Sequence, residues 1–85
     1  MNNVRDKELL IRFGLNLKRL REQQGLSQEE LYYRANLSKN QIGNIERGEV
    51  NTTISTIFVI AKALKIEMKD LFLFDYPTKY NDNEI

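Results

Sequence analysis

Cysteine and histidine are both absent from the 85 residues of the chain. Without cysteine there is neither a disulfide framework nor a thiolate zinc site. Without histidine the chain also lacks the usual general base and the commonest metal ligand. No paired carboxylates fall in an expected cleft. We therefore expect no enzyme, no metal site, no cofactor and no small-molecule ligand.

Long hydrophobic runs are also missing. No apolar segment approaches the roughly 18 residues that a membrane-spanning helix requires. The N-terminal segment lacks the apolar stretch and the cleavage site of a signal peptide; it reads MNNVRDKELLIRF. These absences predict a cytoplasmic protein that does not bind a membrane.

A strong charge of either sign is absent, since the net charge is only +1. Domains that bind nucleic acid are usually clearly basic, so the total charge gives that function little support. The charge is nevertheless uneven, because residues 75–85 carry −2 and residues 1–74 carry +3. We expect one folded domain over residues 1–74 and a polar C-terminal tail over residues 75–85.

Hydrophobic spacing and capping residues predict an all-α chain of five helices. In the first helix, leucines and Phe13 recur at steps of three and four residues. Ser27, with Glu30 three residues later, forms a capping box at the start of the second helix. The helices are expected at about residues 6–24, 28–35, 39–47, 54–64 and 68–73. The residues expected on the inward side of the fourth helix are Ile54, Ile57, Ile60, Ala61 and Leu64.

The third helix carries polar side chains on one side. At about 100° per residue, that side consists of Asn40, Gly43, Asn44 and Arg47, flanked by Lys39 and Gln41. Ile42 and Ile45 point the opposite way, toward the core. In the major groove, asparagine and glutamine bond adenine edges, and lysine and arginine bond guanine edges. The second helix, the turn at Asn36 and the third helix follow one another at the spacing of a helix-turn-helix. A solvated helix side is the alternative interpretation.

Three segments together resemble the Cro/C1-type helix-turn-helix repressors, also called the XRE family. They lie within residues 13–72 and read FGLNLKRLREQQGLSQEEL, NLSKNQIGNIERGE and ISTIFVIAKALKIEMKDLF. The resemblance implies a compact five-helix bundle of the lambda-repressor-like DNA-binding type. The small size is most similar to that of restriction–modification controller proteins, and stand-alone phage-type repressors and antitoxins stay open as alternatives.

The resemblance also implies roles for individual residues. Base-reading positions are Lys39, Asn40 and Asn44, and Gln41 beside them is included with this set. Residues implied to bind DNA phosphates are Gln28, Ser38 and Arg47. Arg21 and Glu46 match a family ion pair that joins the first helix to the end of the third, and we expect this pair to be structural.

The predicted function is therefore sequence-specific regulation of transcription by a homodimer on double-stranded DNA with a two-fold site. A dimer requires a second surface, for which the apolar candidates are Phe58, Val59, Leu73 and Phe74. Packing at the edge of the core is the alternative role for these four residues. The alternative function is a protein-interaction module, such as an antitoxin that binds a partner protein. The near-neutral charge and Tyr32, where the family has a small residue, favour that alternative.

Overall fold

The computed structural model describes residues 5–75, and this part of the chain is helical without any strand. It contains α1 (Lys7–Gln23), α2 (Gln28–Ala35), α3 (Lys39–Glu46), α4 (Ile54–Leu64) and the 3-10 helix η1 (Met68–Phe72). The all-α prediction is confirmed, but five α-helices are not, because the last helix is of the tighter 3-10 type. Within the described range no helix combines the length and hydrophobicity needed to cross a bilayer. The predicted tail lies outside the described residues beyond Asp75.

Each α-helix begins at a side-chain cap, which satisfies backbone N–H groups that the helix itself leaves open. The capping oxygens accept from the N–H three residues on, and they belong to Asp6, Ser27, Ser38 and Thr53. At α2 and α3 the capping is reciprocal, because the side chains of Glu30 and Gln41 accept from the N–H groups of the two capping serines. These local bonds fix where the helices begin.

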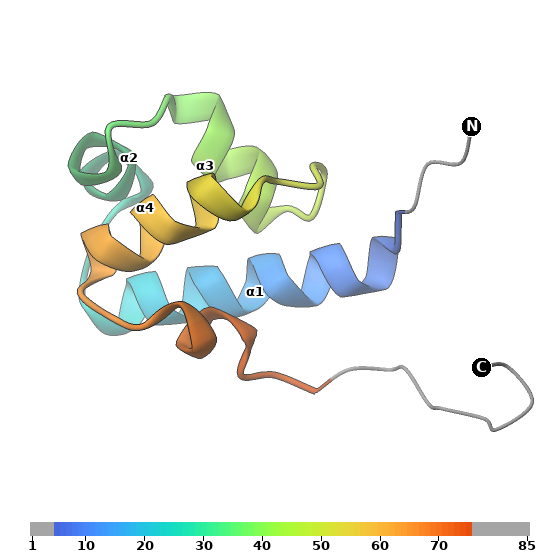
Figure 1. Ribbon diagram of the computed structural model, residues 1–85. Coiled ribbons are helices and arrows are strands. Elements are labelled where there is room, and N and C mark those ends of the chain that lie inside the picture. The colour runs from blue at the N-terminus through green and yellow to red at the C-terminus, as the bar shows by residue number, and fades with distance from the viewer. Residues whose placement is uncertain (1–4, 76–85) are drawn as a thin grey trace, which may run out of the picture.

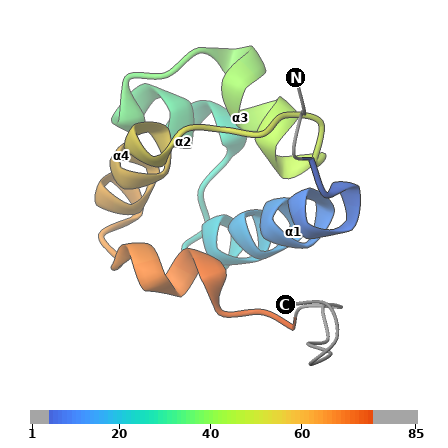
Figure 2. The ribbon, with the colours of Figure 1, turned by 45° about the vertical axis from the view of Figure 1, so that its right-hand side comes forward.

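The core is built from one apolar stripe of each helix. The largest fully buried side chains are Leu17, Leu31, Ile42, Ile60, Leu64 and Leu71. In Figure 1, α3 and α2 lie above α1, and η1 lies below it; Figure 2 shows the same order after rotation. α3 packs against α1 and α2, and α4 packs against α2 and η1. The consequence is a small bundle in which α3 keeps one side free.

The prediction for Ile54 is wrong, because its side chain is 76% exposed. Ile54 shares the angular position of the buried Ala61 but lies about two turns earlier. It is the first residue of α4, at an end where no described residue covers most of its side chain. Angular position on a helix therefore leads to burial only where a neighbouring element covers that turn.

Two glycines allow α1 to approach the C-terminal end of α3 closely. A Cβ atom on Gly14 would lie 2.5 Å from the carbonyl oxygen of Glu46 and closer still to that of Ile45. After α3, Gly48 has a φ of +72°, and a Cβ there would lie 2.7 Å from the Cα of Ile11. Backbone atoms occupy the space on both sides, so neither position accommodates a side chain.

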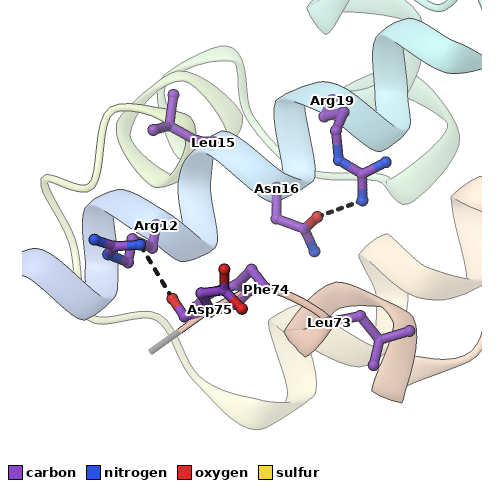
Figure 3. A pocket seen from close by; sticks show the side chains of 7 residues that line it. All are labelled: Arg12, Leu15, Asn16, Arg19, Leu73, Phe74 and Asp75. Atoms are coloured by element: carbon purple, nitrogen blue, oxygen red, sulfur yellow. Dashed lines mark hydrogen bonds between the residues drawn. The ribbon is translucent and has the colours of Figure 1, made fainter. Parts of the chain in front are cut away.

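A buried asparagine attaches η1 to the other side of α1. The Nδ2 of Asn16 donates to the carbonyls of Asp70 and Leu71 at 3.1 and 2.9 Å. Figure 3 shows Arg19 donating to Asn16 and Arg12 donating to the main chain of Asp75, at 2.7 and 3.2 Å. The chain after η1 therefore runs along α1 and forms an open groove with it, on the side away from α3.

Candidate nucleic-acid interface

A tight turn sets the angle between α2 and α3. Asn36 closes α2 in the left-handed conformation, with φ +57° and ψ +41°, which asparagine tolerates better than most residues. The N–H of Leu37 then donates to the carbonyl of Tyr32 at 2.9 Å. Tyr32 itself is half-buried and packs against the core. The bulky side chain is thus accommodated while α2 and α3 remain packed together.

The outer side of α3 faces solvent. Ile42 and Ile45 are 0% and 3% exposed and hold the opposite side in the core. Asn44 is half-buried, and the exposed residues of the outer side are Lys39, Asn40, Gln41 and Arg47. Over residues 5–75, no group of three or more acidic side chains is placed to bind a metal ion. The surface of α3 therefore consists mainly of side chains that donate and accept hydrogen bonds.

Gln41 uses its acceptor locally. Its Oε1 accepts from the N–H of Ser38 at 2.8 Å, while the Ser38 hydroxyl oxygen accepts from the N–H of Gln41 at 3.3 Å. A bidentate contact with adenine requires both the acceptor and the donor of an amide. In this conformation Gln41 keeps both Nε2 donors, while one of the two lone pairs of its Oε1 is already used. The Ser38 hydroxyl likewise keeps its O–H as a donor, which suits a phosphate oxygen.

The structure brings Arg21 and Glu46 together in a buried ion pair. The Nε of Arg21 lies 2.6 Å from Oε2 of Glu46, its Nη2 lies 2.9 Å from Oε1, and its Nη1 donates to the carbonyl of Leu26 at 2.7 Å. The two side chains are 8% and 2% exposed. The hydrogen bonds to Glu46 raise the pKa of Arg21. The pair anchors the end of α3 to α1.

Gln28 joins the same network from the start of α2. Its Nε2 donates to Oε1 of Glu46 at 2.8 Å, although 18 positions separate the two residues in the chain. The residue is otherwise exposed, and the second hydrogen of the amide nitrogen is available for a partner outside the domain. Glu46 therefore orients the residue that the family pattern assigns to a phosphate. Local sequence gives no signal of this contact.

Arg47 folds back over α3 at its C-terminal end. Its Nη2 donates to Oδ1 of Asn44 at 2.5 Å, and its Nε lies 3.1 Å from Oε1 of Glu49. The guanidinium covers Gly43, since a Cβ there would lie 3.0 Å from Nη1. Sequence reasoning did not identify this arrangement. A glycine four residues before an arginine on one helix side was the only signal for it.

The apolar candidates for a second surface divide into two groups. Phe58 and Leu73 are 49% and 64% exposed, so both are accessible. Val59 and Phe74 are half-buried, and the Phe74 ring packs edge-on against Phe13 at 6.4 Å between centroids. Ile54 joins the accessible group, so that two of its members lie on α4 and Leu73 directly follows η1. The Nζ of Lys62 lies 5.7 Å from the centroid of the Phe58 ring.

Comparisons with known proteins agree with this geometry. A helix-turn-helix family model matches residues 17–71. The control protein C.BamHI of Bacillus amyloliquefaciens is 35% identical over 74 residues, which are 86% of this chain and 85% of that protein. The restriction-modification controller protein C.AhdI from Aeromonas hydrophila has a TM-score of 0.73 at 41% identity, covering 74% of this chain and 96% of that one. The C.Esp1396I tetramer in complex with its natural 35 base-pair operator aligns with a TM-score of 0.72 at 33% identity, covering 79% and 88%.

Proposed function

This chain belongs to the helix-turn-helix family, and on that premise we propose that it is a sequence-specific regulator of transcription that binds double-stranded DNA. The observation that carries the proposal is the exposed polar side of α3, held outward by Ile42 and Ile45 and braced by α2. An α-helix fits the major groove of B-DNA, where each base pair has a distinct pattern of donors and acceptors. The similar C.Esp1396I tetramer, in complex with its natural operator, supports the same assignment. We place this function in the cytoplasm.

In the proposed complex, α3 lies in the major groove with its outer side toward the base edges. Lys39, Asn40 and Asn44 then face base edges, where their side chains discriminate sequence. Gln28 and Ser38 face phosphates with the N–H and O–H that their contacts within the domain leave available. Such phosphate contacts set the register of the helix and carry no sequence information themselves. Arg47 is the third phosphate ligand in the family pattern.

A single short helix reads only a few base pairs, so we propose that a homodimer binds a two-fold operator. Half-sites about one helical turn apart would place two copies of α3 on the same side of the duplex. The accessible apolar residues Ile54, Phe58 and Leu73 are our candidates for the dimer surface. The low net charge predicts weak binding to random DNA, because non-specific affinity comes from phosphate neutralisation.

The experiment that tests the proposal is selection of bound duplexes from a randomised DNA pool at near-physiological salt, followed by sequencing. We expect a motif with two-fold symmetry and half-sites about one turn apart. An asymmetric short motif would retain the DNA-binding function and contradict the dimer. No enrichment by protein that circular dichroism shows to be folded would overturn the proposal. That result would favour a protein-interaction module, with Tyr32 the first residue to examine.

A further inference from the structure

We infer that Asn44 and Arg47 form one unit that reads guanine in the major groove, so that Arg47 is a specificity-determining residue and not only a phosphate ligand. The inference rests on the proposed function and adds a base preference to it. It starts from the juxtaposition of three side chains at the C-terminal end of α3. Asn44, Arg47 and Glu49 contact one another in series.

The guanidinium of Arg47 is held in place from two sides. Glu49 pairs with its Nε at 3.1 Å, and the amide oxygen of Asn44 accepts from its Nη2 at 2.5 Å. Arginine has five N–H donors, so these contacts leave both hydrogens of Nη1 and one of Nη2 for a partner. A side chain fixed before binding loses less rotational freedom when it binds. The free edge of the guanidinium is therefore a preorganised pair of donors.

The same contact changes what Asn44 offers. Its Oδ1 is occupied by Arg47, whereas its Nδ2 has no partner among residues 5–75. A free asparagine reads adenine by accepting from N6 and donating to N7. With one of the two Oδ1 lone pairs taken by Arg47, Asn44 keeps both Nδ2 donors and one acceptor position. Together, the two residues offer mainly donors to the groove, namely the free N–H groups of Arg47 and the Nδ2 of Asn44.

Only one purine matches an edge of donors. Guanine has two acceptors in the major groove, N7 and O6, and arginine bonds to both in the commonest specific contact known. Adenine places the N6 amino group, a donor, where the pair also places donors. We therefore expect guanine over adenine at the base pair that faces Asn44 and Arg47, by a factor of roughly 5 to 150 for one bidentate contact.

Gly43 provides the space in which the guanidinium lies. The three nearest atoms to a Cβ at this position would all belong to the Arg47 guanidinium, with Nη1 at 3.0 Å and the next two at 3.7 Å. Alanine would therefore displace the end of one flexible side chain and leave the backbone in place. Glycine inside a helix is unfavourable relative to alanine, so Gly43 lowers the stability of α3. Its missing side chain leaves the space that the Arg47 guanidinium occupies.

Two substitutions test the inference and separate it from folding. Gly43→Ala is expected to raise the melting temperature by roughly 4–8 °C, given the helix propensity of alanine and the size of the domain. The same variant should lose part of its preference for guanine, because the Arg47 guanidinium has to shift away from the new methyl group. Arg47→Lys keeps the positive charge but lacks the fork, and it should lose the preference as well.

The selection is repeated with both variants and with Arg34→Lys, a matched control at an exposed arginine of α2. The recovered duplex is then titrated with 7-deazaguanine, which lacks the N7 acceptor, in place of the selected guanine. We expect weaker binding for wild type and for Arg34→Lys, a smaller loss for Gly43→Ala, and little change for Arg47→Lys. Equal base preferences in all four proteins would overturn the inference and leave the proposed function intact. No motif from folded wild-type protein would overturn both.

Discussion

At the scale of single residues, two glycines inside helices have opposite surroundings. A Cβ on Gly14 would lie 2.5 Å from the carbonyl oxygen of Glu46, which belongs to the backbone of α3. The nearest atoms to a Cβ on Gly43 would belong to the end of the Arg47 side chain. The same change to alanine therefore has opposite consequences at the two sites, although both lie in an α-helix.

We predict that Gly14→Ala destabilises the domain. Alanine gains about 1 kcal/mol of helix propensity over glycine, but its methyl group forces α1 and α3 apart. The net loss should be about 1–3 kcal/mol, as for other substitutions that overpack a core. Urea denaturation followed by circular dichroism measures the change, with Gly43→Ala as the control that gains stability. Similar stability of the two variants would contradict the close approach of α1 and α3.

The buried ion pair gives a second prediction at this scale. Arg21→Met leaves the carboxylate of Glu46 buried with only the Gln28 hydrogen bond, and it should cost about 3–5 kcal/mol. The double variant Arg21→Met/Glu46→Leu should recover much of that loss, because no uncompensated charge remains. A double-mutant cycle in urea measures both effects. A single-variant cost below about 1 kcal/mol would be typical of an exposed pair and would rule out burial.

At the scale of one element, the start of α2 depends on a charged capping residue. The side chain of Glu30 accepts from the N–H of Ser27 at 2.9 Å, and the Ser27 hydroxyl oxygen accepts from the N–H of Glu30 at 3.0 Å. The hydrogen bond from the Ser27 backbone, with that from its side chain, lowers the pKa of Glu30 below the ordinary value of 4.5. The ionised form of Glu30 is therefore the form that stabilises the helix.

A lowered pKa predicts the direction of the pH dependence. The contribution of Glu30 is fully present above about pH 4.5, the ordinary value, and is lost as the pH falls through the lower pKa of the folded state. Glu30→Gln keeps an acceptor oxygen but does not titrate, so its stability should fall less than that of wild type between pH 6 and pH 3. Denaturation at both pH values measures this. The control is Glu29→Gln, in the same turn but outside the capping box, and an identical response of both variants would contradict the prediction.

At the scale of the whole molecule, the proposed DNA-reading side and the proposed dimer surface lie on different elements. α3 carries the polar side, whereas the exposed apolar residues Ile54 and Phe58 lie on α4, and Leu73 follows η1. α3 and α4 both pack on α2, which relates the two surfaces within one rigid core. A dimer formed through α4 would therefore fix the spacing between two copies of α3, and with it the spacing of the half-sites.

We predict that Phe58→Glu dissociates the dimer and preserves the fold. Phe58 is 49% exposed, so a carboxylate there is solvated in the monomer but buried in the proposed interface. The new carboxylate would also pair with Lys62 one turn later, which supports α4 in the monomer. Sedimentation equilibrium measures the association constant, which should fall more than about tenfold. The control is Tyr33→Glu at an 83% exposed position of α2, and a Phe58→Glu protein that remains dimeric would place the interface elsewhere.

The sequence by itself determined the local structure of this protein. Ser27 and Ser38 have their capping partners three residues away, and Asn36 tolerates the left-handed conformation, so short segments predict both helix starts and the turn between them. The alternation of buried isoleucines and polar residues in α3 follows from helical periodicity alone. The family pattern added expected roles for the residues on that side.

Only the tertiary structure decided the contacts between segments that are distant in the chain. Gln28 meets Glu46 across 18 positions, and Gly14 permits α1 to lie against the carbonyls of α3. Ile54 is exposed because no element of the described residues 5–75 covers its end of α4, which periodicity does not reveal. Helix propensity and capping act within a few residues, whereas burial and buried hydrogen bonds depend on how whole helices cross. For this reason the sequence predicted the outer side of α3, and the structure showed which of its donors and acceptors are already in use.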